Sequence, residues 1–138
     1  MAELAVLKLG GSVLTRVPAY QTAARFLRDE LARTRSRIVA VVSAEDGHTD
    51  RLRADALAIA AEPDSDALDL LWSTGELRSV ALLTLALRAE GVTATGLNVH
   101  ETGLRVGTAA GVRPAPADLI LNPLPLRAAL GGHDVVVV

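Results

Sequence analysis

Three short polar segments of the chain carry the residue types that bind phosphate groups and small polar substrates. They are Lys8-Leu9-Gly10-Gly11-Ser12, the stretch from Ser43 to Asp50, and Ser73-Thr74-Gly75-Glu76. Each lies where a predicted strand or turn ends and a helix or loop begins, which is where open α/β sheets keep their ligand sites. We therefore treat the three segments as parts of one candidate site.

The first segment has the chemistry of an anion site. Lys8 lies inside an apolar run, where an ammonium group is rarely buried without a partner, so we expect an anionic group beside it. Gly10 and Gly11 allow the backbone to approach a ligand and to offer its N–H groups, while Lys8 supplies a point charge suited to phosphate. The alternative is a glycine turn, with the lysine stem along the strand end and its ammonium in solvent.

The second segment joins the end of a predicted strand to a helix. Its hydroxyls and amides, including those of Ser43 and Thr49, fall at the same edge of the sheet as the first segment, so we expect the two loops to be neighbours. The alternative is structural. Thr49 or Asp50 has the side chain to cap a helix that begins at Arg51.

The third segment also has two interpretations. Serine at a cap with glutamate three residues later, as in Ser73 and Glu76, forms a capping box that starts a helix. Gly75 in the first turn of such a helix costs about 1 kcal/mol relative to alanine, which is unusual for a purely structural cap. A glycine there would let a ligand or another backbone approach.

Two further polar clusters lie in predicted loops. One is His100 with Glu101, and the other is Glu45 with Asp46 and His48. Such clusters are usually solvated, so we assign neither an acid–base pair nor a metal site to them.

The predicted elements alternate in a way that would bring the three segments to one edge of a sheet. A strand, a helix and a strand come first, which predicts a parallel pair, and two helices follow, the second interrupted or tightened near Gly75. Two strands, a third strand, a short helix and a last strand complete the chain. The predicted ranges are 5–9, 22–34, 38–42, 47–61, 66–88, 92–97, 104–106, 118–121, 124–130 and 135–138.

Composition excludes several classes of protein. The 138 residues, 50% of them hydrophobic and 22% charged, suit one soluble globular domain over residues 1–138. A net charge of -2 and few aromatic residues argue against nucleic acid as a partner. The absence of cysteine excludes disulfides and thiolate metal sites. Charged residues near the N-terminus argue against a signal peptide or membrane span, so we expect a cytoplasmic protein.

The ordered motifs resemble those of aspartate kinases, members of the amino-acid kinase family. The resemblance rests on Lys8 to Ser12, on Val42-Ser43-Ala44 with Gly47-His48-Thr49-Asp50, and on Ser73 to Glu76. It implies a three-layer α/β/α sandwich with a mostly parallel sheet. It also implies that Lys8, Gly10, Gly11 and Ser12 lie near the phosphates of Mg-ATP, with Lys8 as the catalytic residue. The remaining residues would bind an aspartate-like acceptor: Ser43, Thr49, Asp50, Ser73, Thr74, Gly75 and Glu76.

The chain departs from that family after its last predicted strand. Aspartate kinases continue there with the half that binds adenine and ribose, so we expect a truncated, acceptor-binding half. Glu45 and Asp46 also replace the small or apolar residues usual in the second loop, and carboxylates repel a triphosphate. We expect a homo-oligomer or a complementary chain, and phosphoryl transfer only if that partner completes the nucleotide site. The alternative is a non-catalytic or repurposed module, which binds a small molecule or protein or performs ATP-independent chemistry.

Overall fold

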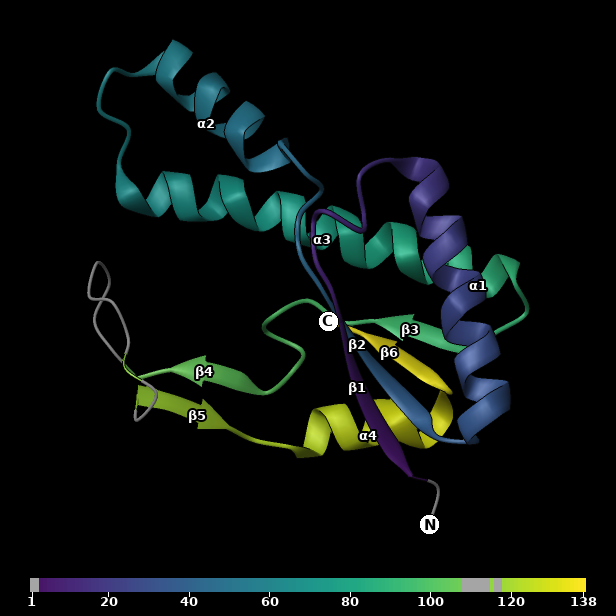
Figure 1. The fold of residues 1–138 in the computed structure, drawn as a ribbon. Helices are drawn as coiled ribbons and strands as arrows, with labels where there is room; N and C mark the ends of the chain where they lie inside the picture. The colour runs from purple at the N-terminus through teal and green to yellow at the C-terminus, as the bar shows by residue number, and fades with distance from the viewer. Residues whose placement is uncertain (1–2, 108–114, 116–117) are drawn as a thin grey trace.

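The computed structural model describes residues 3–107, 115 and 118–138, and its centre is a sheet of four parallel strands (Figure 1). The strands are β1 (Leu4–Leu9), β2 (Arg37–Val42), β3 (Ala94–Gly96) and β6 (Val135–Val137). They lie in the order β1-β2-β6-β3, so β1 and β3 form the edges. A separate antiparallel pair consists of β4 (Leu104–Val106) and β5 (Leu119–Leu121).

The register of the sheet brings the ends of β1 and β2 together. Leu9 pairs with Val42, so the loops that follow these two strands leave the sheet side by side. The parallel pair predicted for the two strands is confirmed. The backbone N–H of Ser43 donates to the carbonyl of Leu9 at 3.3 Å, which joins the two loops directly.

One face of the sheet is covered by two helices, α1 (Val17–Thr34) and α3 (Ser65–Ala89). The main core lies between them and the sheet. Leu27 of α1 and Leu83 of α3 are fully buried there against Ile38 and Val135. Helix α3 comes especially close to β3, because a Cβ added at Gly96 would lie 2.7 Å from a methyl carbon of Val80.

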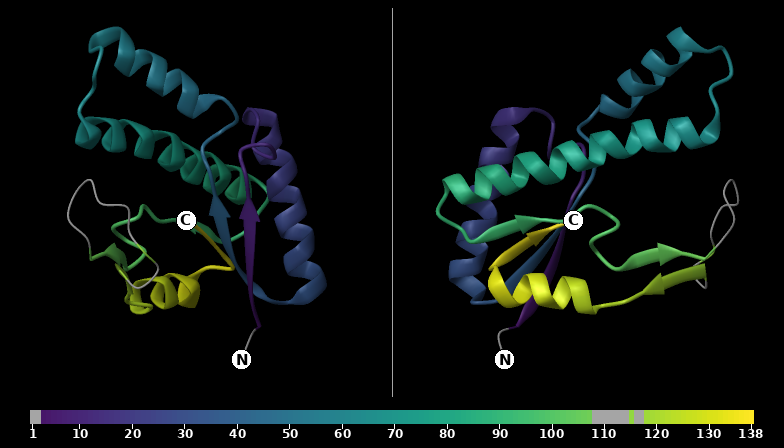
Figure 2. Two further views of the ribbon diagram at one scale, coloured as in Figure 1. Left: turned by 60° about the vertical axis from the view of Figure 1, so that its left-hand side comes forward. Right: turned by 180° about the vertical axis from the view of Figure 1, so that it is seen from behind.

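Helix α3 is long, but it belongs to the core. Of the described helices, it alone has the length and hydropathy to cross a membrane, yet its Val80, Leu83 and Leu87 pack against the sheet. Its N-terminal half extends beyond the sheet and pairs with α2 (His48–Ile59) as a helical hairpin, which both views in Figure 2 show projecting from the body.

Among the described residues, a single helix, α4 (Leu124–Gly132), covers the other face of the sheet. Leu130 of α4 packs against Val39 and Val136, which forms a second, smaller core. The helices on both faces confirm the predicted three-layer α/β/α arrangement. Helix α4 does not reach β1, where Leu4 and Val6 stay 55% and 64% exposed.

Most elements begin and end within two residues of the bounds that the hydrophobic pattern predicts. Helix α1 begins at Val17, because Pro18 suits a first helical turn, where its missing N–H is not needed. Strand β3 is limited to Ala94–Gly96. Helix α3 runs without a break through Gly75, so the predicted interruption there is wrong.

Candidate functional site

The loop after β1 packs directly against the loop after β2. A Cβ added at Gly11 would lie 2.7 Å from the carbonyl oxygen of Ala44 and 3.3 Å from the backbone nitrogen of Asp46. Real Cβ atoms essentially never come that close to a backbone oxygen, so only glycine fits between the loops. The predicted neighbourhood of the first two segments is confirmed. Gly10 differs from Gly11, because an added Cβ there would meet no atom within 4 Å.

The third segment meets the second one through Gly75. A Cβ on this buried glycine would lie 2.8 Å from Cδ2 of His48 and 3.2 Å from Cβ of Ala44. Glycine is unfavourable inside a helix, but at this position of α3 it allows the second loop to pack closely against the helix backbone. Ala44 thus lies between Gly11 and Gly75, and all three polar segments converge around it.

A buried polar cluster holds the second loop from behind. Glu45 is buried and forms an ion pair with Nη1 of Arg78 on α3. The hydroxyls of Tyr20 and Ser79, both buried, share a hydrogen bond of 2.9 Å. The expectation that Glu45 is a solvated loop carboxylate is wrong, because it is buried and paired with Arg78, whereas Asp46 beside it is exposed as expected. No local signal marks this pair, since its members are far apart in the chain.

The charges of this cluster follow from its burial. Burial by itself would raise the pKa of Glu45, but the hydrogen bond and positive charge of Arg78 outweigh it and lower the pKa below its ordinary value. Burial raises the pKa of Tyr20, and the nearby charge of Glu45 adds to that rise against the effect of the Ser79 hydrogen bond. At neutral pH the cluster therefore contains an ionised Glu45 beside a neutral phenol.

Lys8 is not buried, which corrects the expectation drawn from its apolar neighbours. It lies on edge strand β1, on the same face as Leu4 and Val6, where no helix covers the strand. In the described part of the chain, neither a hydrogen bond nor an ion pair joins it to another side chain. Lys8 is also the only lysine of the sequence, and Ser12 close by is exposed. The ammonium is accessible to an external anion.

The structure rejects both predicted capping roles. Helix α2 begins at His48 after Gly47, whose φ of 67° is left-handed, and no side chain of the described residues caps it. Thr49 and Asp50 are exposed in its first turn. The predicted capping box fails too, because Ser73, Thr74 and Glu76 all lie inside α3.

The side chains of the third segment point to different places around α3. The hydroxyl of Ser73 donates to the carbonyl of Leu70 at 2.7 Å, and that of Thr74 donates to Leu71 at 2.6 Å. Ser73 and Glu76 face the open side of the sheet, whereas Thr74 faces the groove between α2 and α3. Four residues of one segment therefore do not form a single cluster, and only part of it can contact one ligand.

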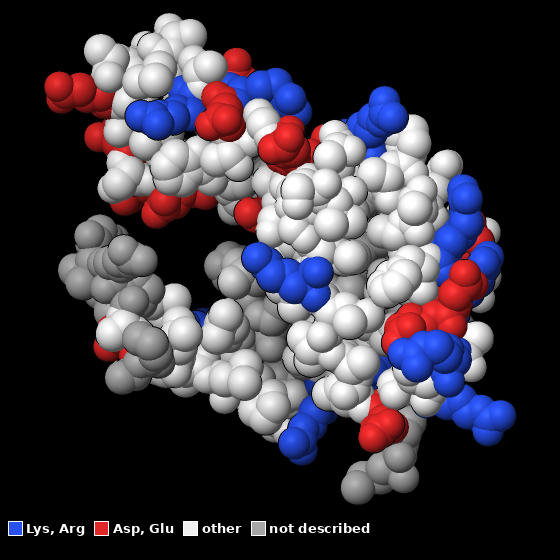
Figure 3. Space-filling model, in the orientation of Figure 1, with Lys and Arg blue, Asp and Glu red and all other residues white. Residues whose placement is uncertain are grey.

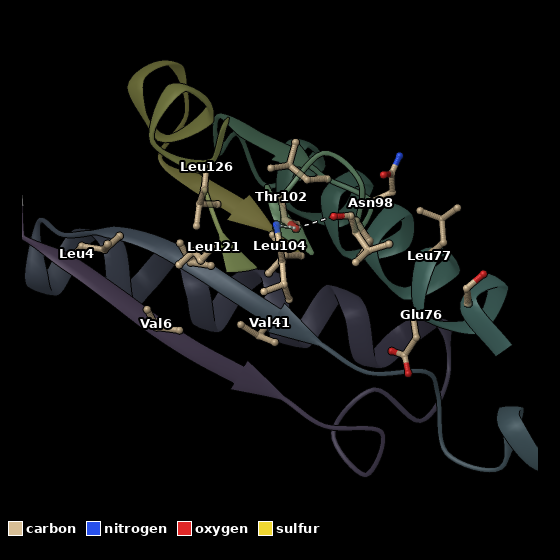
Figure 4. A pocket seen from close by; sticks show the side chains of 16 residues that line it. Leu4, Val6, Val41, Glu76, Leu77, Asn98, Thr102, Leu104, Leu121 and Leu126 are labelled. Atoms are coloured by element: carbon tan, nitrogen blue, oxygen red, sulfur yellow. Dashed lines mark hydrogen bonds between the residues drawn. The ribbon is translucent and has the colours of Figure 1, made fainter. Parts of the chain in front are cut away.

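An apolar groove of about 600 Å³ runs along the uncovered face of the sheet. Figure 4 shows Glu76 and Leu77 of α3 at one end of it and Leu4 of β1 at the other. Its remaining walls come from the sheet, further residues of α3, the loop after β3, the β4–β5 pair and α4. They include Val6, Val39, Val41, Val80, Leu97, Asn98, Val99, Thr102, Leu104, Leu121, Leu126 and Val138. Glu76 therefore places a carboxylate at the polar end of an apolar surface.

The residues available for a cofactor are those of the first segment, Lys8 to Ser12. Gly10 has open space beside its backbone and Lys8 is accessible, so both fit an approaching phosphate group. Within residues 3–107, 115 and 118–138, no three His, Asp or Glu side chains converge as ligands for a metal ion.

The sequence and the structure of the chain are both similar to those of known proteins. Residues 3–137 match the profile described as the amino acid kinase family. An aspartokinase of Thermus thermophilus is 39% identical over 102 residues, which are 74% of this chain and 24% of that protein. The crystal structure of aspartate kinase from Synechocystis superposes on 97% of this chain and 21% of its own, with a TM-score of 0.73 and 32% identity.

A more distant structure shares the fold. The chain superposes with a TM-score of 0.73 on aspartokinase III of E. coli, solved in complex with aspartate and ADP, at 21% identity over 98% of this chain and 40% of that one. The chain therefore spans about a quarter of the Thermus relative and less than half of either structure.

Proposed function

This chain belongs to the amino acid kinase family, and from that premise we propose that it binds an aspartate-like amino acid as the acceptor half of a phosphotransferase. Phosphoryl transfer from ATP then requires a second chain or copy that completes the nucleotide site. The observation that carries the proposal is the convergence of all three polar segments around Ala44, through close approaches at Gly11 and Gly75.

The chain's own residues would position two substrates. Lys8, Gly10, Gly11 and Ser12 are proposed to hold the phosphates of Mg-ATP, which supplies the phosphoryl group when bound. A lysine ammonium and backbone N–H groups offset the charge that develops during transfer without taking part in covalent chemistry. The exposure of Lys8 and the open space beside Gly10 support this assignment.

The acceptor would lie between the second and third segments. Glu76 is proposed to hold the ammonium group of the amino acid, with Ser73 beside it on the same side of α3. Ser43, Thr49 and Asp50 of the second segment would contribute further polar contacts. Thr74 faces the groove between α2 and α3 and Gly75 packs against the second loop, so neither is given a contact with the acceptor. The acceptor's side-chain carboxylate then attacks the γ-phosphorus, forming an acyl phosphate and releasing ADP. Aspartate and ADP bound to the E. coli relative support this substrate pair.

The need for a second chain or copy rests on the uncovered face of the sheet. Parallel sheets are normally covered on both faces, whereas Leu4 and Val6 of edge strand β1 remain more than half exposed. The free edge of β1 adds unpaired backbone groups beside the same apolar surface. A partner that covers this region would also bring residues close to Lys8 at the end of β1.

The proposal is tested by calorimetric titration with L-aspartate, with and without Mg-ATP. We expect heat from aspartate alone, stronger binding when a partner and Mg-ATP are present, and a large loss of aspartate affinity in Glu76→Gln. Glu62→Gln, an exposed carboxylate outside the three segments, is the matched control and should bind as the wild type does. The acceptor role is contradicted if the titration with L-aspartate gives no binding heat, or if Glu76→Gln binds aspartate as tightly as the wild type.

The role of Lys8 has an independent test, because it is the only lysine of the chain. Reductive methylation followed by mass spectrometry reports on this amine and the N-terminus alone. We expect Mg-ATP, in the presence of a completing partner, to protect Lys8 and to leave the N-terminus reactive. Lys8→Ala should lose nucleotide binding with little change in folding, because the side chain is exposed. Unchanged binding contradicts the phosphate role.

A further inference from the structure

The helical hairpin carries a second groove, which the proposed function does not use. It lies between α2 and the N-terminal half of α3, has a volume of about 490 Å³ and shares no lining residue with the groove on the sheet. Its walls are aliphatic, with Ala56 and Ile59 from α2 and Leu68, Leu70 and Leu71 from α3. Ile59 is 89% exposed and Leu70 is 72% exposed, so the hairpin presents large apolar side chains to solvent.

The same hairpin has a strong local charge. Residues 54–77 contain six of the 16 acidic residues of the chain and none of the 14 basic ones, so this stretch has a formal charge of -6 and the remainder +4. Five of the six surround the loop between the helices: Asp55, Glu62, Asp64, Asp66 and Asp69. All five are exposed, and among the described residues none forms an ion pair. Figure 3 shows acidic side chains at the end of the hairpin, with basic ones near the start of α2.

We propose that this hairpin groove docks a basic amphipathic helix of a partner protein. A groove between two packed helices accepts a third helix, whose apolar side chains would cover Ile59 and Leu70. The acidic rim then selects a helix with Lys or Arg beside its apolar face, by complementary charge. The same rim repels nucleic acids and anionic lipid surfaces, which therefore do not fit this groove.

The probe is a fluorescein-labelled peptide of about 18 residues, with Leu and Lys arranged to form an amphipathic helix. Its counterpart has Glu in place of every Lys. Fluorescence anisotropy measures the binding of both peptides to the full chain at low and high NaCl. We expect saturable binding of the Lys peptide only, weakened by salt because its charge pairs lie at an exposed rim.

Two kinds of variant locate the binding. Ile59→Lys should weaken the Lys peptide at least about tenfold, as expected for removing one buried aliphatic contact and adding a like charge. Asp66→Lys with Asp69→Lys should weaken it further through the rim. Because Ile59 is largely exposed, its replacement should leave the melting temperature unchanged. Thermal unfolding of the samples used for the binding measurements checks this.

Two control variants test the other apolar surfaces. Leu85→Lys changes an exposed leucine of α3 outside the groove, and Val6→Thr changes the open face of the sheet. Both should bind the Lys peptide as the wild type does. Equal binding of the two peptides, no binding of either, or a loss confined to Val6→Thr would overturn the proposal. So would a dimer in light scattering that Ile59→Lys dissociates, because a second copy would then cover the groove.

Discussion

Alanine at Gly10 and at Gly11 should have opposite effects on stability, although the two glycines are adjacent. At Gly11 the new Cβ would lie 2.7 Å from the carbonyl oxygen of Ala44, and at Gly10 it would meet nothing within 4 Å. Neither glycine has a positive φ, so alanine can adopt both backbone conformations. The pair of variants therefore isolates the contact between the first two loops.

The expected difference follows from two opposing contributions. Alanine restricts the unfolded chain, which stabilises the protein by about 0.4–1 kcal/mol wherever the native conformation allows it, and this gain is common to both positions. Overpacking costs about 1–3 kcal/mol and applies to Gly11 alone. The free energies of unfolding should thus differ by about 1–3 kcal/mol. For a chain of this length that corresponds to a separation in Tm of roughly 4–12 °C.

Thermal unfolding followed by circular dichroism measures both variants against the wild type. Gly10→Ala should melt at or slightly above the wild-type temperature, and Gly11→Ala several degrees below it. Two coincident melting curves would show that the loops after β1 and β2 are not packed as described. The contact between Gly11 and Ala44, on which the candidate site partly rests, would then be contradicted.

Two further predictions concern the packing behind the site. Gly75→Ala should change stability little by itself, because the better helix propensity of alanine, about 1 kcal/mol, offsets the clash with His48. In a His48→Ala protein the clash with the imidazole is gone, so Gly75→Ala should stabilise that protein by nearly the whole of this gain. Denaturant unfolding of the two single variants and the double variant measures this, and additive effects would contradict the contact. Because Arg78 holds the pKa of Glu45 below its ordinary value of 4.5, the pair stabilises the protein above that pH and ceases to do so as pH falls through the lowered pKa. As the pH is lowered, the free energy of unfolding should therefore fall more steeply for the wild type than for Glu45→Gln. Parallel profiles of the two proteins would show that Glu45 does not contribute to the acid sensitivity.

Much of the fold could be predicted from local pattern. The apolar run from Ala5 to Leu9 and the β-branched run from Ile38 to Val42 form strands, and the amphipathic stretch after Pro18 forms a helix, as their periodicities indicate. The neighbourhood of the first two segments was also predictable. Because β1 and β2 are parallel and paired in register, the loops that follow them leave the sheet at the same edge.

The errors came where local pattern and tertiary position disagree. Lys8 has apolar neighbours on both sides, but β1 is an edge strand without a helix over one face, and strand order is not written in any single strand. Ser73 and Glu76 have the spacing of a helix start, yet they lie within α3, because the turns that precede them are helical and pair with α2. In both cases long-range packing decided the outcome.

The sequence by itself determined the type and order of the elements, the family and the identity of the polar segments, because hydrophobic period and motif spacing are local properties. Only the tertiary structure decided which residues became neighbours. It buried Glu45 against Arg78, set Gly11 and Gly75 on either side of Ala44 and left Lys8 and the end of the hairpin in solvent. The physical reason is that burial and charge pairing depend on the whole set of packed elements, whose contacts join residues far apart in the chain.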